Sequence, residues 1–168
     1  TTSAKTGCNA PTAAPAAEEQ TEFTVILAAF GAGMAAAKFL PAVKRMFAGR
    51  PLLEQRIAAL DAAAWVTLAG RVEREALVEH YRRAWLVVSA SLAEGWGLSL
   101  TEGAACGTPC VATDIRGHRS SVVADATGVL VELDRLGPTI ADVLLDDARR
   151  ASLTTAALAR ARSLTWEN

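Results

Sequence analysis

The sequence has few aromatic residues and no concentration of basic residues, which argues against a nucleic-acid-binding protein. Phe, Trp and Tyr make up 5% of the 168 residues, and only one tyrosine is present. The 17 Lys and Arg residues are balanced by 18 Asp and Glu residues, so the formal net charge is -1. Single-stranded nucleic acids need aromatic side chains for stacking, and nucleic acids in general need a basic surface. We expect no nucleic-acid partner.

Cysteine is also scarce, and no metal-binding pattern is present. The three cysteines, Cys8, Cys106 and Cys110, lack metal-ligand spacing, and the sequence contains no Asp-x-Asp pair. We therefore expect Cys106 at a helix end and Cys110 at a strand start, as small buried residues, with no metal and no cofactor. The chain does not open with a charged region followed by an apolar stretch, so a cytoplasmic location is the default expectation.

No apolar run is long enough to cross a membrane. The longest, residues 23–37, has 15 residues, whereas a spanning helix needs about 20. We expect residues 23–40 to form a packed helix. A surface-lying helix anchored by Lys44 and Arg45 is an alternative that would place the protein at the inner face of the membrane.

A second alternative for this segment is a dinucleotide-binding turn. Gly31 and Gly33 fit the pattern G-x-G-x-x-A after the β-branched run at residues 24–26. That motif needs an acidic residue about twenty positions later to hold a ribose. Residues 40–51 contain no Asp or Glu, which disfavours an oxidoreductase-type domain.

The chain is expected to form one α/β domain over residues 23–168, after a disordered or irregular segment at 1–22. The first segment is rich in Thr, Ala, Ser and Pro and cannot bury enough apolar surface to offset its ordering entropy. Apolar strands then alternate with helices, which indicates a parallel sheet with helices on both faces. Strands are expected at 43–48, 65–69, 85–89, 109–113 and 128–131, and helices at 51–63, 73–84, 97–106, 134–148 and 149–163.

The most informative segment is residues 94–114. Glu94-Gly95-Trp96-Gly97 puts a carboxylate and two glycines before a helix start, and Glu102 follows within that helix. Loop glycines let backbone N–H groups approach phosphate oxygens, and a helix N-terminus favours negative charge. Carboxylates repel phosphate but accept hydrogen bonds from sugar hydroxyls. The arrangement suits a sugar diphosphate.

This segment resembles the E-x7-E signature of retaining glycosyltransferases with two Rossmann-like domains, the GT-B type, and in particular family 4. The family pattern E-G-[FW]-G, then E-A, then G-x-P-V-V-A-[ST] corresponds to residues 94–97, 102–103 and 107–113, with Gly103 in place of the alanine and Cys110 in place of the first valine. Further segments match at 47–54, 66–72, 86–91 and 127–131, together with Leu77 and Tyr81 in L-x-x-x-Y. The resemblance implies the Rossmann-like C-terminal, donor-binding domain of such an enzyme.

The resemblance also implies roles for individual residues. Glu94 would contact hydroxyls of the donor sugar as the catalytic residue, and Glu102 would bind the ribose hydroxyls. The loop and helix start would meet the diphosphate, Gly70 to Val72 would border the base, and Gly117 with His118 would lie near the sugar. The donor-binding residues are thus Gly95, Trp96, Gly97, Leu98, Ser99, Glu102, Gly70, Arg71 and Val72.

Two features of related enzymes are missing from the sequence. Residues 1–22 contain no G-R-x-x-x-x-K-G segment, whose basic residues would face the diphosphate, and no acceptor-binding domain is present. We therefore expect hexose transfer, from a GDP-mannose or UDP-glucose type donor, to require a partner chain or domain. The alternative to a donor-binding domain is a non-catalytic interaction module.

Overall fold

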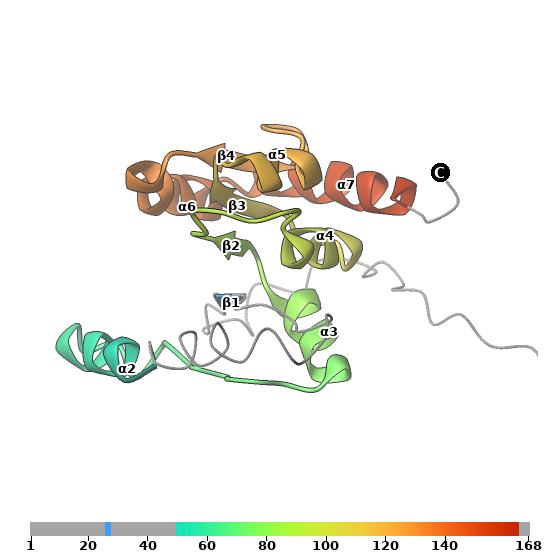
Figure 1. The fold of residues 1–168 in the computed structure, drawn as a ribbon. Helices are drawn as coiled ribbons and strands as arrows, with labels where there is room; N and C mark the ends of the chain where they lie inside the picture. Colours follow the sequence, from blue (N-terminus) through green and yellow to red (C-terminus); the bar gives the residue numbers. More distant parts are fainter. Residues whose placement is uncertain (1–25, 28–49, 165–168) are drawn as a thin grey trace, which may run out of the picture. The chain divides into compact units, whose positions relative to one another are not determined.

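The structure is a computed structural model that describes residues 26–27 and 50–164 (Figure 1). Internal contacts divide the chain into two units, one made of residues 1–28 and 72–168 and the other of residues 29–71. The described part of the first unit contains a parallel sheet and most of the helices. The described part of the second unit contains one helix, α2.

Within residues 26–27 and 50–164, the sheet has four parallel strands in the order in which they occur in the chain. They are β1 (Ile26–Leu27), β2 (Val87–Ser89), β3 (Cys110–Thr113) and β4 (Gly128–Val131), and Figure 1 shows them side by side in that order. Val88 pairs with Val111, and Val111 pairs with Val129, so these three valines form one row across the sheet.

This row of valines faces helices α6 (Leu136–Leu145) and α7 (Asp147–Ser163). Val88, Val111 and Val129 belong to one buried cluster with Leu136 and Val143 of α6 and Leu153 of α7. The apolar residues of α6 recur at positions 136, 140, 143 and 144, the spacing of a single helix face. That spacing explains why α6 packs on the sheet.

The opposite sheet face is covered by α3 (Arg74–Arg83) and α4 (Leu98–Ala105). Tyr81 of α3 and Leu100 of α4 are buried in a cluster with Val87 and Ala112 of the sheet. Gly103 allows α4 to approach closely, because a Cβ at this position would lie 2.6 Å from Val87 Cγ2. Helices on both faces confirm the predicted Rossmann-like arrangement.

The remaining elements connect or extend these layers. Helix α5 (Arg116–Ser121) follows β3, and the short 3₁₀ helix η1 (Leu133–Arg135) precedes α6. In the second unit, α2 (Arg50–Ala59) is followed by a turn in which Asp61 has a left-handed φ of 50°. The Ala62 N–H bonds back to the Ile57 carbonyl at 2.9 Å, which satisfies a helix-end carbonyl.

The predicted elements of the central fold are confirmed, with small shifts in their ends. The strands expected at 85–89, 109–113 and 128–131 and the helices expected at 73–84 and 97–106 are present. The boundary between the last two helices lies at Asp146, because its carboxylate accepts a hydrogen bond from the Arg149 N–H at 2.9 Å and caps α7. Cys106 ends α4 and Cys110 begins β3, as expected.

Two predictions are wrong. The helix expected over 23–40 does not include Ile26 and Leu27, which pair with β2 as an edge strand. The strand expected at 65–69 is absent, and the described residues 65–69 pair with no strand; each of them is partly or fully exposed. A strand needs a neighbour to pair its backbone groups, which local apolar content does not provide. The strand expected at 43–48, the segment 1–22 and Gly31 with Gly33 lie outside the described residues.

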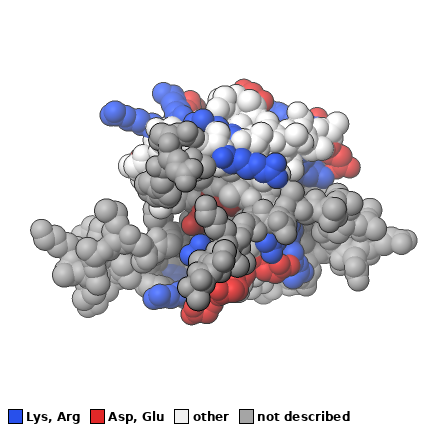
Figure 2. All heavy atoms as spheres, turned by 90° about the vertical axis from the view of Figure 1, so that its right-hand side faces the viewer, with Lys and Arg blue, Asp and Glu red and all other residues white. Residues whose placement is uncertain are grey.

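Lys and Arg side chains are mixed with Asp and Glu side chains on the described surface. Figure 2 shows both signs interspersed over the described part of one face, without a broad basic patch. None of the described helices is long and apolar enough to cross a membrane.

Candidate functional site

The candidate site lies at the carboxyl edge of the sheet, where two loops meet. One loop, residues 90–97, joins β2 to α4 and carries Glu94. The other, residues 114–115, joins β3 to α5, which carries Gly117 and His118. The carboxyl ends of parallel strands meet at one edge, where ligands of such sheets bind. Residues far apart in the sequence are thereby brought together.

Gly97 begins α4 in a left-handed conformation, with φ of 73° and ψ of 56°. The N–H groups of Leu98 and Ser99 follow in the first turn, where an α-helix offers no internal acceptor. Among the described residues, no backbone carbonyl accepts from either N–H group. Leu98 is 56% exposed. These amides can therefore meet an anion at the helix start.

Two glycines let the loops pack against one another. A Cβ on Gly117 would lie 2.2 Å from the Glu94 carbonyl oxygen, and a Cβ on Gly97 would lie 2.9 Å from His118 Cδ2. Neither distance is compatible with a larger residue. By contrast, a Cβ on Gly95 would meet no atom within 4 Å. Gly97 and Gly117 thus fix the loop that carries Glu94.

The Glu94 carboxylate is turned into the protein. Its side chain is only 4% exposed. Its Oε1 accepts a hydrogen bond from Ser91 Oγ at 2.5 Å, whereas Oε2 is buried and has no hydrogen-bond partner among the described residues. The nearest charged or ionisable partner of Oε2 is His118 Nε2, at 3.7 Å. A buried carboxylate oxygen without a hydrogen bond is costly and calls for a functional explanation.

His118 is completely buried and held on both ring nitrogens. Nδ1 lies 2.7 Å from the Thr113 carbonyl oxygen and 3.3 Å from Thr113 Oγ1. Nε2 lies 3.2 Å from Ser89 Oγ, which in turn lies 3.3 Å from Ser91 Oγ. Ser89 and Ser91 were not among the predicted site residues, and a pair of serines around a strand end is a weak sequence signal.

Glu102 has a different environment from Glu94. It lies on the exposed side of α4 and accepts a hydrogen bond on Oε2 from the Tyr81 hydroxyl at 3.1 Å. Burial of the ring and the neighbouring Glu102 carboxylate both raise the pKa of Tyr81, so the hydroxyl remains a donor. The L-x-x-x-Y motif contained the signal for this contact, because Tyr81 is its last residue.

Several polar contacts stabilise the rims of the site. Trp96 is 37% exposed, and its Nε1 donates to Thr101 Oγ1 at 3.0 Å, which ties the loop to α4. Arg119 of α5 donates to both carboxylate oxygens of Asp114, at 2.5 and 2.8 Å. The Arg119 hydrogen bonds lower the pKa of Asp114.

The other predicted residues are distributed over both units. Gly70, with φ of 67°, and Arg71 belong to the second unit, whereas Val72 belongs to the first. Within the described residues, no group of three or more His, Cys, Asp or Glu side chains could hold a metal ion.

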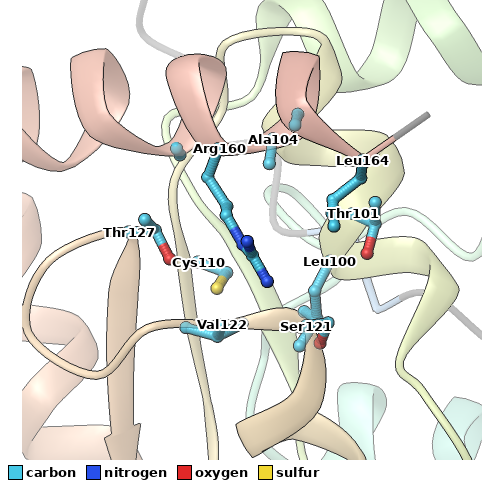
Figure 3. A pocket seen from close by; sticks show the side chains of 11 residues that line it. Leu100, Thr101, Ala104, Cys110, Ser121, Val122, Thr127, Arg160 and Leu164 are labelled. Atoms are coloured by element: carbon cyan, nitrogen blue, oxygen red, sulfur yellow. The ribbon is translucent and has the colours of Figure 1, made fainter. Parts of the chain in front are cut away.

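A small cavity lies apart from this site, between α4, α7 and the start of β3. Figure 3 shows Arg160 of α7 extending into it toward Cys110. Its volume is about 10 Å³, room for about one water molecule, whereas ligand pockets usually measure about 300 Å³ or more. It is too small for a nucleotide.

Comparison with known proteins gives a family match over most of the chain. The family model described as "Glycosyl transferases group 1" matches residues 34–160. This range includes the 94–102 segment and both loops of the candidate site.

The similar curated proteins are much longer than this chain. D-inositol 3-phosphate glycosyltransferase of Xylanimonas cellulosilytica is 41% identical over 103 residues, which is 57% of this chain and 24% of that protein. The protein of that name from Mycolicibacterium smegmatis is 36% identical over 144 residues, 79% of this chain and 32% of its own length. The chain therefore spans about a quarter of the first relative and about a third of the second.

Two of the solved structures with the same fold have descriptions that mention a sugar compound. Sucrose-phosphate synthase from Thermosynechococcus elongatus has a TM-score of 0.66 at 31% identity, covering 71% of this chain and 31% of that chain. HepE from Anabaena, solved with UDP-glucose, has a TM-score of 0.61 at 25% identity, covering 67% and 32%. The C-terminal domain of LpcC from Francisella tularensis, 21% identical with a TM-score of 0.58, covers 77% and 65% and supports the fold alone.

Proposed function

Because the chain belongs to the glycosyl transferases group 1 family, we propose that it forms the donor-binding part of an enzyme that transfers a hexose from a nucleotide sugar, with retention, to an acceptor. The donor is of the UDP-glucose or GDP-mannose type. One observation carries the proposal: α4 begins with the amides of Leu98 and Ser99, which bond to no described backbone carbonyl, and these amides lie between Glu94 in the preceding loop and Glu102 within the helix.

The diphosphate of the donor is assigned to the start of α4. The amides of Gly97, Leu98 and Ser99 would donate to its oxygens, and the positive end of the helix dipole would stabilise their charge. A phosphate group could approach the backbone at exposed Gly95, because nothing lies within 4 Å of the Cβ position of this residue. The protein's contribution to transfer is then positioning and stabilisation of the leaving phosphate, without a covalent intermediate.

The two acids are assigned to hydroxyl groups on either side of the diphosphate. Glu102, held by Tyr81, would accept hydrogen bonds from the ribose. Glu94 would accept a hydrogen bond from a sugar hydroxyl near the reacting carbon. The turn at Gly70, Arg71 and Val72 is assigned to the base, on the basis of its family resemblance.

The acceptor is assigned to a part of the enzyme outside these 168 residues, because the relatives are three to four times longer than the matched segment. We expect the isolated chain to bind donor without transferring the sugar. A nucleotide-sugar donor also fits the cytoplasmic location expected from the cysteine content.

Donor binding is tested by isothermal titration of the chain with UDP, GDP, UDP-glucose, GDP-mannose and NAD. We expect binding of one nucleotide and its sugar derivative. Glu102→Ala should weaken that binding roughly tenfold to a hundredfold, the effect of losing a hydrogen bond to a charged group. Tyr81→Phe should weaken it less, because Glu102 remains.

The matched control is Glu79→Ala, which removes an exposed carboxylate from α3 with the same change in charge. It should leave the affinity unchanged. Binding of NAD alone would point instead to a dinucleotide-binding domain. Self-association with no response to any nucleotide would identify an interaction module.

A further inference from the structure

The orientation of the Glu94 carboxylate is set by groups outside its own loop. Ser91 donates to Oε1 at 2.5 Å, which fixes one oxygen. The other oxygen, Oε2, is directed toward His118 Nε2 at 3.7 Å and accepts no hydrogen bond from the described residues. Because the side chain is 4% exposed, it cannot turn freely as a surface carboxylate would.

The tautomer of His118 follows from its contacts. The Thr113 carbonyl oxygen, 2.7 Å from Nδ1, can only accept a hydrogen bond. Nδ1 therefore carries a hydrogen and donates to it. The same contact orients the ring, so that Nε2 faces Ser89 Oγ and the Glu94 carboxylate. The Thr113 hydroxyl also donates to the Ser91 carbonyl at 2.5 Å, which ties β3 to the Glu94 loop.

His118 makes its polar contacts within the protein, so we assign it a supporting role in place of the sugar contact expected from the sequence. The side chain is 0% exposed, and both ring nitrogens are engaged within the protein. Its Cδ2 lies so close to Gly97 that a Cβ there would approach to 2.9 Å. The missing Cβ of Gly97 thus leaves room for the His118 ring beside Glu94.

We propose that His118 is a positioning residue that, together with Ser91, presents the Glu94 carboxylate to a sugar hydroxyl of the donor. The inference rests on the proposed function, and it assigns sugar recognition to a buried unit of Glu94, His118, Ser89 and Ser91. The nucleotide part of the donor is bound by other groups. Loss of His118 therefore reduces the affinity for the sugar portion and leaves the affinity for the nucleoside diphosphate.

The experiment measures the extra affinity that the sugar adds, as the ratio of the Kd values of the nucleoside diphosphate and the nucleotide sugar. UDP with UDP-glucose, and GDP with GDP-mannose, are the probes. The variants are Glu94→Gln, His118→Asn, His118→Gln and Ser91→Ala. Asn retains a donor near the position of Nδ1 for the Thr113 carbonyl, whereas Gln retains a polar group near the position of Nε2 beside Glu94.

We expect Glu94→Gln and His118→Asn to reduce the ratio by about tenfold or more, as expected for a hydrogen bond to a charged group. His118→Gln should restore most of it, to within about threefold of the wild type. The Kd of the nucleoside diphosphate should stay within about twofold in all variants. A residue that merely fills space would give equal losses in the Asn and Gln variants, and that result would overturn the proposal.

The two hypotheses fail in different ways. If the wild type binds no nucleoside diphosphate, or gains nothing from the sugar, the proposed function fails and the positioning role fails with it. If the wild type gains affinity and Glu94→Gln loses it, while His118→Asn keeps it, only the positioning role is overturned. Where circular dichroism shows that a histidine variant is unfolded, Ser91→Ala decides: a reduced ratio supports the proposal, and an unchanged ratio overturns it.

Discussion

Gly117 places Glu94, although it makes no hydrogen bond through a side chain. Its missing Cβ leaves room for the Glu94 carbonyl oxygen, which would otherwise lie 2.2 Å away. A backbone atom cannot move aside as the end of a flexible side chain can. The position of the catalytic candidate is therefore set by a glycine 23 residues away in the sequence.

Gly117→Ala should displace the Glu94 loop and destabilise the fold by about 1–3 kcal/mol, the usual effect of overpacking. Nucleotide-sugar binding should fall by at least about tenfold, because a misplaced Glu94 loses a hydrogen bond to a charged group. Urea unfolding and isothermal titration measure the two effects. For the stability measurement, the matched control is Gly95→Ala in the Glu94 loop, where a Cβ meets no atom within 4 Å. Equal destabilisation by both substitutions would show that loop packing is not the cause.

At the residue scale, the sequence predicted the site residues but not the different environments of the two acids. Glu94 and Glu102 have similar roles in the motif, and the sequence predicted that both would face ligand hydroxyls. The structure buries Glu94 against His118 and leaves Glu102 exposed beside Tyr81. That difference depends on which other elements pack beside each acid. The spacing of residues within the motif does not determine this packing.

At the scale of elements, the close contact between α4 and β2 sets the position of the helix start. Gly103 is the point of closest approach, with Val87 Cγ2 at 2.6 Å from its Cβ position. Helix α4 has only eight residues. A small displacement of its middle therefore moves its N-terminal amides as well.

Gly103→Ala and Gly137→Ala form a matched pair, since each replaces a helical glycine by alanine. Gly137→Ala adds a Cβ in open space in the first turn of α6, immediately before Pro138, where the helix preference of an interior alanine does not apply, so it should change the stability by less than about 0.5 kcal/mol. Gly103→Ala gains helix propensity but must displace Val87, and should destabilise by about 1–2 kcal/mol net. Urea unfolding measures both. Stabilisation by Gly103→Ala would contradict the packing described here.

Elements with strong local patterns were predicted correctly, and elements that depend on distant partners were not. Strands β2, β3 and β4 are apolar segments between helical ones, and the sequence identified them. Residues 65–69 have the same local character but pair with no described strand. Ile26 and Leu27 gain a partner in β2, because the edge of the sheet is available to them.

At the scale of the whole molecule, two buried ionisable groups couple global stability to alkaline pH. Burial raises the pKa of the Cys110 thiol to about 12 from the reference value of 9.0. Burial, and then Glu102, raise the pKa of Tyr81 above its reference value of 10.0. In both cases folding favours the neutral form of the side chain, so at alkaline pH the group is ionised more readily in the unfolded state.

The free energy of unfolding should therefore be constant with respect to Cys110 below pH 9 and should fall as the pH rises from 9 toward 12. The slope approaches about 1.4 kcal/mol per pH unit for one thiol. Tyr81 adds a further loss above pH 10. Urea midpoints at pH 8, 9.5 and 11 measure this loss in the wild type and in Cys110→Ala.

Cys110→Ala should be less stable at pH 8, because it leaves a cavity, but should lose less stability as the pH rises. The difference between the two proteins removes the contribution of Tyr81 and of all other groups. Parallel pH dependences in the two proteins would show that folding does not raise the pKa of Cys110.

The sequence by itself determined the family, the alternation of strands and helices, and the loop that begins at Glu94, because these depend on spacing over about twenty residues. The tertiary structure decided which acid is buried, that Tyr81 holds Glu102, and that His118 faces Glu94. These contacts join residues 21 to 24 positions apart through the parallel pairing of β2 and β3 and the packing of α3 on α4. Contacts of that kind depend on how whole elements fit together, which no local pattern specifies.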